Sequence, residues 1–539
     1  MKNIFKTLNY YRKVALFLVS AFMMGVVITS CSDDIIELEP YSSVSETSAF
    51  STPSLIETSV NGMYQAAQMG WYNSSLPGGA PRGYIWGAAF VQQGDNRGED
   101  VVNIASFYAF TYQTTYNATT ANNIYYWFDA YRLINRANIV IDGVTKAVAA
   151  GTITAAVGDD YIGQALFLRA ITHMELLTHF AKPYKFTAGA THLGVPYRTV
   201  PYTTEPNVEE GKAQGRNSVK ECYDLIIKDL NDARDKMISK SARGSVKLGI
   251  VYASKEAATA MKTRAYLNMG LWDDVITEGV KLNSLYSLTP SPDGPFAANY
   301  SNTESIFSLE QTASNNPGQN AALASQYNGR KLVCMSPIIW RDTDWLQDDK
   351  RRQIGTMVFE SVSTDGKFKT IFTNKYKDPT NFTDASPIIR FAEVKLNMAE
   401  AYARKASPDL TNALTQLNLV RDRSLANPAT QSHTSTTLNT QTKMVEAILK
   451  ERRIEFAMEG RRWGDIHRLQ HETIGGISGI PAKIANGEPL KEHYVVGTPY
   501  TGAKTLVNIP YSDYRFLWPI PQAEVDANPI LKAQQNPGW

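Results

Sequence analysis

The sequence predicts a mainly α-helical protein in which paired helices pack against a lobe rich in loops and short strands. Two observations lead to this prediction. Apolar helix patterns recur as adjacent pairs joined by short turns, and long stretches between them are rich in Gly, Asn, Thr, Ser, Pro and Tyr. No low-complexity linker or run of charge divides the chain. We therefore expect one domain over residues 48–539, with loop-rich insertions at about 70–123, 290–383 and 475–514.

Candidate cap residues predict the starts of two helices. Asp159-Asp160 is a candidate cap for a helix over residues 161–180, which is apolar on most of its circumference and is therefore expected to be buried. Ser218 and Glu221 have the spacing of a capping box, in which each side chain bonds the backbone of the other residue. The apolar stripe that follows this box predicts a second helix.

Two pairs of adjacent helices are similar to tetratricopeptide units. The first pair is predicted over residues 254–269 and 272–282, and the second over residues 389–404 and 409–420. Repeats of this kind, about 34 residues long, stack because one pair cannot bury its apolar face alone. We therefore expect the two pairs to pack against each other or against further helices.

The N-terminus has the features of an export signal. Four basic residues precede an uncharged segment, and small residues lead to Cys31. The apolar run is shorter than the ~20 residues that span a bilayer. The order Ile28-Thr29-Ser30-Cys31 resembles the lipobox of bacterial lipoproteins, in which the cysteine carries lipid after cleavage. An ordinary secretory signal with a coincidental cysteine is the alternative.

The segments on either side of Cys31 are assigned accordingly. Residues 1–30 are predicted to be the lipoprotein signal peptide, and residues 31–47 an acidic tether between the lipid and the folded body. Ser32-Asp33-Asp34 resembles the sorting motif that sends some lipoproteins to the outer face of the outer membrane. The expected location is therefore the outer membrane, with a lipid anchor on Cys31 and the protein facing the cell exterior.

The charge balance argues against two classes of partner. Without residues 1–30 the formal charge changes from +2 to −2, since the leader holds four basic residues and no acidic ones. Neither nucleic acid nor anionic lipid is an expected partner of such a chain. Of the two remaining cysteines, Cys222 lies in the apolar stripe of a helix, which favours a buried free thiol. A disulfide between Cys222 and Cys334 remains an alternative.

Several further segments follow the lipobox in order. They are ANNIYYWFDAYRLINRAN (121–138), QALFLRA (164–170), FAKPY (180–184), LGVP (193–196), AEVKLNMAEAY (392–402), ERRIEFAMEGRRWGD (451–465), LWPIP (517–521) and QNPGW (535–539). Taken together with the lipobox, these segments resemble the SusD/RagB-like family of outer-membrane nutrient-binding lipoproteins, over nearly the whole chain after the leader. The resemblance implies a SusD-like fold and a surface protein that captures oligosaccharide or polysaccharide, or sometimes peptide, without catalysis. It also implies delivery to a SusC-type TonB-dependent transporter, with no cofactor.

Two clusters of ionisable residues invite a catalytic or metal-binding interpretation. Glu451, Glu455 and Glu459 share one face if the helix continues through them, and arginines flank them. We interpret this cluster as a structural ion-pair network, because buried charges persist when they are paired. His467 and His471 are four residues apart, but no HExxH motif or cysteine pair accompanies them, so a zinc site is not favoured.

Aromatic residues in loops are the better candidates for ligand contact. The apolar C–H face of a sugar stacks on an aromatic ring, and nearby polar side chains bind the hydroxyl groups. Tryptophans in Gly-, Pro- or Asp-rich loops suit a partly exposed platform of this kind. Convergence of the early loop region with the late loop over residues 314–345 would strengthen the case for these residues. The candidate glycan-binding residues are Trp71, Tyr72, Arg82, Trp86, Asp95, Asn96, Tyr108, Trp340 and Trp345.

Two other functions are compatible with the sequence. A surface glycoside hydrolase would need two carboxylates about 5–5.5 Å or about 6.5–9.5 Å apart across a cleft. A helical-repeat scaffold would bind peptide or protein in the concave face of its repeats.

Overall fold

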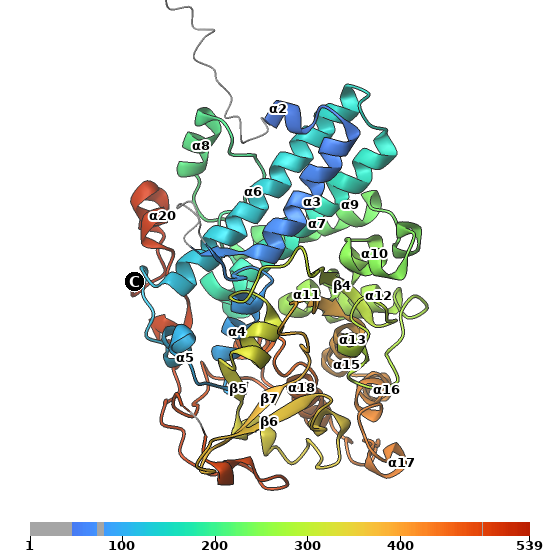
Figure 1. Ribbon diagram of the computed structural model, residues 1–539, viewed down its shortest axis with the longest axis vertical. Helices are drawn as coiled ribbons and strands as arrows, with labels where there is room; N and C mark the ends of the chain where they lie inside the picture. Colours follow the sequence, from blue (N-terminus) through green and yellow to red (C-terminus); the bar gives the residue numbers. More distant parts are fainter. Residues whose placement is uncertain (1–45, 73–79, 488) are drawn as a thin grey trace, which may run out of the picture.

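The computed structural model describes residues 46–72, 80–487 and 489–539 (Figure 1). The predicted signal peptide, Cys31 and nearly all of the acidic tether lie outside these residues. Within the described part of the chain, no helix combines the length and apolar character needed to cross a bilayer.

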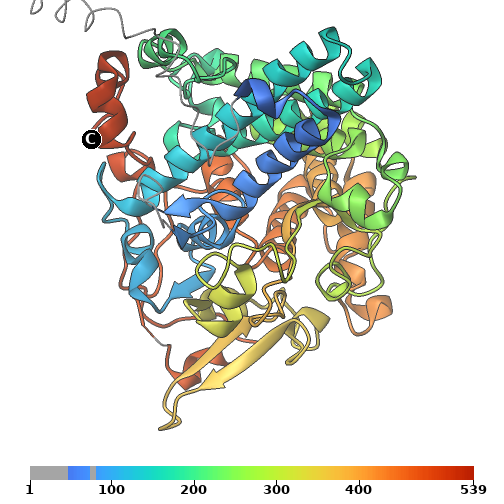
Figure 2. The same cartoon turned by 45° about the horizontal axis from the view of Figure 1, so that its top comes forward.

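Long helices near the N-terminus form one side of the molecule (Figures 1 and 2). After the short α2 (Glu46–Ala49), α3 (Pro53–Met69) packs on α6 (Ala121–Ala149), which packs on α7 (Ala155–Phe180). The next helix in this layer is α9 (Val219–Lys236), which packs on α7. Contact with neighbours on both sides explains why α7 is apolar on most of its surface.

The start of α7 differs from the prediction. The helix begins at Ala155 with Thr154 as its cap, whose hydroxyl accepts from the Val157 N–H at 3.4 Å. The predicted cap at Asp159-Asp160 is wrong, because Asp160 lies inside the helix and its carboxylate forms a buried ion pair with Arg243. By contrast, the capping box of Ser218 and Glu221 is confirmed at the start of α9.

The paired helices lie where the sequence places them. The first pair is α11 (Lys255–Met269) and α12 (Trp272–Val280), and the second is α15 (Phe391–Arg404) and α16 (Leu410–Asp422). Gly270 ends α11 with a φ of 73°, a backbone conformation that favours glycine. The two pairs stack through α12 and α15, and α18 (Gln441–Glu455) packs on the second pair.

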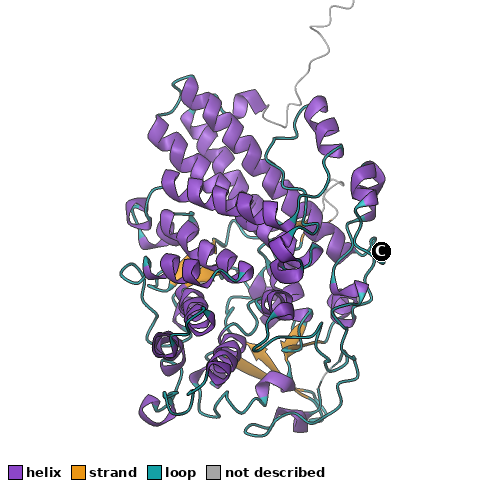
Figure 3. Ribbon diagram, turned by 180° about the vertical axis from the view of Figure 1, so that it is seen from behind, coloured by secondary structure: helices purple, strands orange, loops and turns teal. Residues whose placement is uncertain are grey.

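The strands lie in or at the edges of the predicted loop-rich stretches and form small antiparallel sheets (Figure 3). Two sheets join distant parts of the chain, since β3 pairs with β5 and β4 with β8. The described strands are β1 (Trp71–Tyr72), β2 (Ala80–Pro81), β3 (Val101–Asn103), β4 (Ser305–Leu309), β5 (Val333–Met335), β6 (Val358–Val362), β7 (Lys369–Thr373) and β8 (Ser386–Arg390).

Short helices connect these sheets with the helical layer. A large cluster of buried apolar side chains extends from Phe50 to Val525 and includes residues of both regions. The C-terminal residues join it, since Asn536 donates to the carbonyls of Phe180 at 2.9 Å and Trp518 at 2.8 Å. The short helices are α4 (Ala88–Asn96), α5 (Ala109–Gln113), α8 (Glu205–Lys212), α10 (Val246–Val251), α13 (Gly294–Ala297), α14 (Pro337–Trp340), α17 (Pro428–Gln431), α19 (Arg462–Arg468), α20 (Gln522–Ala527) and α21 (Pro529–Ala533).

The glutamate cluster is a buried ion-pair network, as predicted. Its geometry differs in one respect: α18 ends at Glu455, so Glu459 is not on the same helix. The charges are balanced by basic residues from other segments rather than by the neighbouring arginines. The pairs are Glu451 with Arg351 (2.6 Å) and Arg421 (3.1 Å); Glu455 with Arg351 (2.9 Å), Arg390 (2.6 Å) and Arg423 (2.6 Å); and Glu459 with Lys375 (2.6 Å) and Arg390 (2.9 Å).

The cysteines and histidines singled out in the sequence have structural contacts. Cys222 and Cys334 are both buried free thiols, which confirms the prediction for Cys222 and leaves the alternative disulfide unformed. Burial raises the pKa of Cys222 to about 12. His467 bonds the Ala181 carbonyl at 2.8 Å, and His471 bonds the Tyr511 hydroxyl at 3.0 Å. Across the described ranges, no group of three His, Cys, Asp or Glu side chains is arranged to hold a metal ion.

Candidate functional site

The early and late loop regions converge, and they meet inside the molecule. β3 pairs with β5, and the Ala88 N–H donates to the Ala321 carbonyl at 3.0 Å. The Tyr327 hydroxyl donates to the Asp95 carboxylate at 2.7 Å, across more than 200 residues of sequence. Several of the predicted ligand residues are therefore buried where the two regions join.

Asp95 and Asn96 make internal contacts at the end of α4. Besides Tyr327, the Gly460 N–H donates to the Asp95 carboxylate at 2.9 Å. Burial raises the pKa of Asp95 to about 7, although these two hydrogen bonds oppose the rise. The Asn96 amide donates to the Gln92 carbonyl at 2.7 Å, and its side chain is fully buried. Both side chains position the loops around them.

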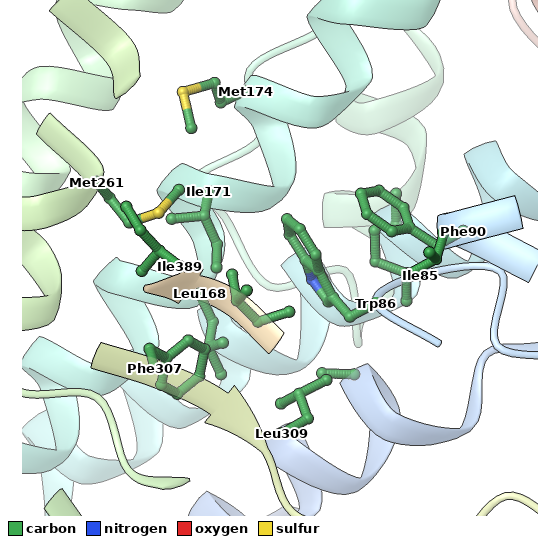
Figure 4. Close-up of a cluster of buried hydrophobic side chains, with 14 of the residues drawn as sticks. Ile85, Trp86, Phe90, Leu168, Ile171, Met174, Met261, Phe307, Leu309 and Ile389 are labelled. Carbon is green, nitrogen blue, oxygen red and sulfur yellow. The ribbon is translucent and has the colours of Figure 1, made fainter. Parts of the chain in front are cut away.

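Trp86 and Tyr108 are also buried, at 1% and 0% exposure. The Trp86 ring packs against Phe90 with ring centres 4.8 Å apart and points into a cluster with Leu168 and Ile171 (Figure 4). Tyr108 makes an edge contact with Phe107, with ring centres 4.8 Å apart. The prediction of a partly exposed aromatic platform is wrong for these two residues, because their rings fill the apolar core.

Trp340 and Trp345 pin the late loop to the body of the protein. Their ring centres lie 5.4 Å apart in an edge contact, and they are 5% and 2% exposed. The Arg352 guanidinium lies 4.6 Å from the Trp340 ring centre and 4.3 Å from that of Trp345. A cation over two aromatic faces is favourable. The predicted exposed platform is wrong here too, because Arg352 and the core cover these rings.

The remaining candidates lie in or beside a hairpin that follows α3. Trp71 pairs with Pro81 and Tyr72 with Ala80, and the segment between β1 and β2 lies outside the described residues. Arg82 is half-buried at the end of this hairpin and donates to the Pro81 carbonyl at 3.0 Å. Trp71, Tyr72 and Arg82 remain predicted ligand residues.

A polar cavity lies between α3, the end of α10 and the segment that follows β4. Its volume is about 250 Å³. Tyr64 and Tyr252, both half-buried, meet there edge to face with ring centres 5.2 Å apart. The other lining residues are Asn61, Gln65, Gln68, Val251, Leu309, Glu310, Thr312 and Asn315. Amide, hydroxyl and carboxylate groups around aromatic rings are suited to a polyhydroxylated ligand.

Hydrogen bonds hold the walls of this cavity in place. The Tyr64 hydroxyl donates to Gln164 at 2.6 Å, and the Tyr252 hydroxyl donates to Asn61 at 3.0 Å. Gln68 donates to the carbonyls of Glu310 and Asn315, at 2.8 and 3.1 Å, which ties α3 to the late loop. Since the tyrosine hydroxyls and the loop are fixed, little side-chain ordering is needed when a ligand binds.

A second cavity of about 510 Å³ adjoins the first and shares Asn61 and Tyr252 with it. Tyr161 and the Asp160–Arg243 ion pair line its far side. Arg243 donates to both Asp160 oxygens, at 2.6 and 2.9 Å. Tyr252 thus lines both neighbouring cavities. We call the two cavities together the Tyr252 groove.

Two of the carboxylates that line the Tyr252 groove form ion pairs. The Glu310 carboxylate forms an ion pair with Lys247, and Asp160 pairs with Arg243. These ion pairs fix the two carboxylates in place at the wall of the groove.

Comparison with known proteins identifies the family. A model described as "Starch-binding associating with outer membrane" matches residues 34–267, and one described as "SusD family" matches residues 340–539. Together they cover most of the chain. This protein belongs to the SusD/RagB-like family.

Solved structures of the SusD superfamily have the same fold. One from Bacteroides fragilis is 28% identical, with a TM-score of 0.71 over 89% of this chain and 99% of that one. Another, from Bacteroides thetaiotaomicron, is 24% identical, with a TM-score of 0.70 over 90% of this chain and 100% of that one. SusD-like protein P38 of Formosa agariphila is 20% identical over 87% of this chain and 94% of that protein. The predicted mainly α SusD-like fold is confirmed.

Sequence reasoning did not find the tyrosines of the groove in this SusD-like chain. Tyr64 lies on α3 between amides at Asn61, Gln65 and Gln68, a spacing that places the amides on neighbouring turns of one helix face. This row of amides around a tyrosine is the sequence feature that could have predicted a polar binding surface on α3. Tyr252 carries no comparable signal, because it reaches the groove only through the packing of α10 near α3.

Proposed function

We propose that this protein is a noncatalytic glycan-binding lipoprotein of the outer-membrane surface, which captures oligosaccharide or polysaccharide and delivers it to a SusC-type TonB-dependent transporter. The observation that carries the binding role is the Tyr252 groove, where half-buried tyrosine rings are surrounded by fixed amide and carboxylate groups. A sugar offers an apolar face for the rings and hydroxyl groups for the polar rim. Trp71, Tyr72 and Arg82, which follow α3 in the sequence, are proposed as further ligand residues.

The descriptions of similar proteins support the same role. One family model is described as starch-binding and associated with the outer membrane. Structures with this fold include a SusD-like carbohydrate-binding protein of Bacteroides vulgatus and the surface glycan-binding protein A of Bacteroides uniformis, which are 22% and 18% identical to this chain. The lipid anchor on Cys31 would hold the protein at the membrane, and docking onto a transporter would be a property of the folded body.

Replacing Tyr252 by alanine is expected to weaken polysaccharide binding by about 1–3 kcal/mol, the range measured for bases stacked on aromatic side chains. The measurement is retardation in native gels that contain starch, xylan, galactomannan or laminarin. Tyr500→Ala is the matched control, since Tyr500 lies in a loop and its hydroxyl bonds only the nearby Ala503 carbonyl in the described structure. Equal retardation of the Tyr252→Ala variant and the wild type would exclude the groove as the binding site.

A further inference from the structure

A third cavity lies on another part of the molecule, between α6, α8 and α20. Figures 1 and 2 show α8 and α20 beside α6. The cavity has a volume of about 460 Å³ and shares no lining residue with the Tyr252 groove. We call it the Arg198 pocket. Its walls include Phe128, Tyr131, Tyr202, Arg132, Asn135, Arg198, Lys212, Glu524 and Asn528.

Arg198 has donor groups that the surrounding protein leaves unused. Its guanidinium lies 4.8 Å from the ring centre of Tyr131 and 5.3 Å from that of Tyr202. Its Nε is buried and has no hydrogen-bond partner in the described structure. The ion pair with Glu524 is 3.7 Å long, which exceeds hydrogen-bond distance. A guanidinium held between aromatic rings with unsatisfied donors is costly unless a ligand or water completes it.

Glu524 presents the complementary acceptor. Its side chain is 24% exposed, and burial raises the pKa of the carboxyl, while Arg198 opposes the rise. Arg198 and Glu524 therefore place donors and acceptors side by side at the wall of the pocket. Two adjacent hydroxyl groups of a sugar ring have this pattern, because each hydroxyl both donates and accepts.

The charges of the pocket indicate an uncharged ligand. Arg132 pairs with Asp129 at 2.8 Å, and Lys212 pairs with Glu209 at 2.5 Å. Since Arg198 faces Glu524, each of the three cations has an acidic partner. A charged ligand would therefore find no unpaired opposite charge among these groups. Phe128 and Tyr202, both half-buried, supply apolar surface beside the polar pair.

We propose that the Arg198 pocket is a second carbohydrate subsite, which binds a neutral sugar with adjacent hydroxyl groups. Arg198 donates to one hydroxyl oxygen, Glu524 accepts from its neighbour, and Phe128 and Tyr202 contact the C–H face of the ring. The ligand class rests on the proposed glycan-binding function. A chain with two separate subsites can hold two parts of one polysaccharide, which increases the overall affinity without any new contact at the first site.

The test compares the full-length wild type with an Arg198→Met Glu524→Gln variant in native gels. The gels contain starch, xylan, galactomannan or laminarin as neutral polysaccharides, and polygalacturonate as an anionic one. Changing both partners avoids leaving a buried charge unpaired, so the variant is expected to fold. The matched control is Lys228→Met Asp232→Asn, which removes an exposed ion pair of 2.5 Å from α9, outside the pocket.

In the neutral gels that retard the wild type, the Arg198→Met Glu524→Gln variant is expected to bind about tenfold more weakly, and the control is expected to match the wild type. If the variant is retarded as strongly as the wild type, the second subsite is ruled out and the proposed function still stands. An effect confined to polygalacturonate would overturn the neutral ligand class. No retardation of the wild type in any gel would contradict the proposed function itself, and the subsite with it.

Discussion

Replacing Glu455 by alanine is expected to lower the free energy of unfolding by about 3–5 kcal/mol, the range found when one partner of a buried ion pair is removed. Glu455 is 2% exposed and pairs with Arg351, Arg390 and Arg423. Without its carboxylate, these buried guanidinium groups lose a shared counter-charge. Urea denaturation followed by tryptophan fluorescence measures the change.

Glu446→Ala is the matched control, because Glu446 lies on the same helix but is exposed. We expect the control to remain within about 0.5 kcal/mol of the wild type. A loss below about 1 kcal/mol for Glu455→Ala would mean that the network is not a main source of stability.

The same network makes stability depend on pH. Burial alone would raise the pKa of Glu455, but the three arginines hold it well below its usual value of 4.5. A carboxyl with a lowered folded pKa stabilises the protein above its unfolded pKa. This contribution is therefore present at neutral pH and is lost as the pH falls below about 4.5.

Replacing Cys31 by alanine is expected to move the protein from the membrane fraction to the soluble fraction. Each buried methylene of an acyl chain contributes about 0.8 kcal/mol, and two or more chains give a stable anchor. Polysaccharide binding should be unchanged, since the Tyr252 groove lies in the folded body. Membrane fractionation and native gels measure the two properties separately.

Ser42→Ala, within the predicted tether, is the control and should stay in the membrane fraction. A Cys31→Ala protein that remains membrane-bound would contradict the lipid anchor. Loss of both membrane retention and polysaccharide binding would mean that the anchor also governs the fold.

Local patterns predicted the paired helices and the helix after the capping box, because their determinants are close in sequence. The capping box of Ser218 and Glu221 needs only residues three apart, and the paired helices need only an apolar repeat and a turn. The start of α7 was placed too late, although its cap is also local, since the Thr154 hydroxyl accepts from the Val157 N–H. Asp160 is a good cap by residue type, but it lies within the helix and its carboxylate pairs with Arg243.

The candidate site was harder to predict, because exposure is decided by tertiary packing. Trp86, Trp340 and Trp345 lie in polar loop sequences, yet the core and Arg352 cover their rings. Asp95 lies in a polar segment with the composition of an exposed turn, yet it is buried against Tyr327. Tyr252 lines the groove only because the fold brings the end of α10 near α3, and the sequence around Tyr252 does not predict that packing. The sequence around each of these residues does not distinguish a buried side chain from an exposed one.

Capture of a glycan without cleavage is the central claim, and one incubation tests it most directly. Purified full-length protein is run in native gels with starch, xylan, galactomannan or laminarin, and the same mixtures are assayed for new reducing ends. We predict retardation by at least one polysaccharide and no increase in reducing ends in any mixture. New reducing ends, or migration unaffected by all four polysaccharides, would contradict a noncatalytic glycan-binding role.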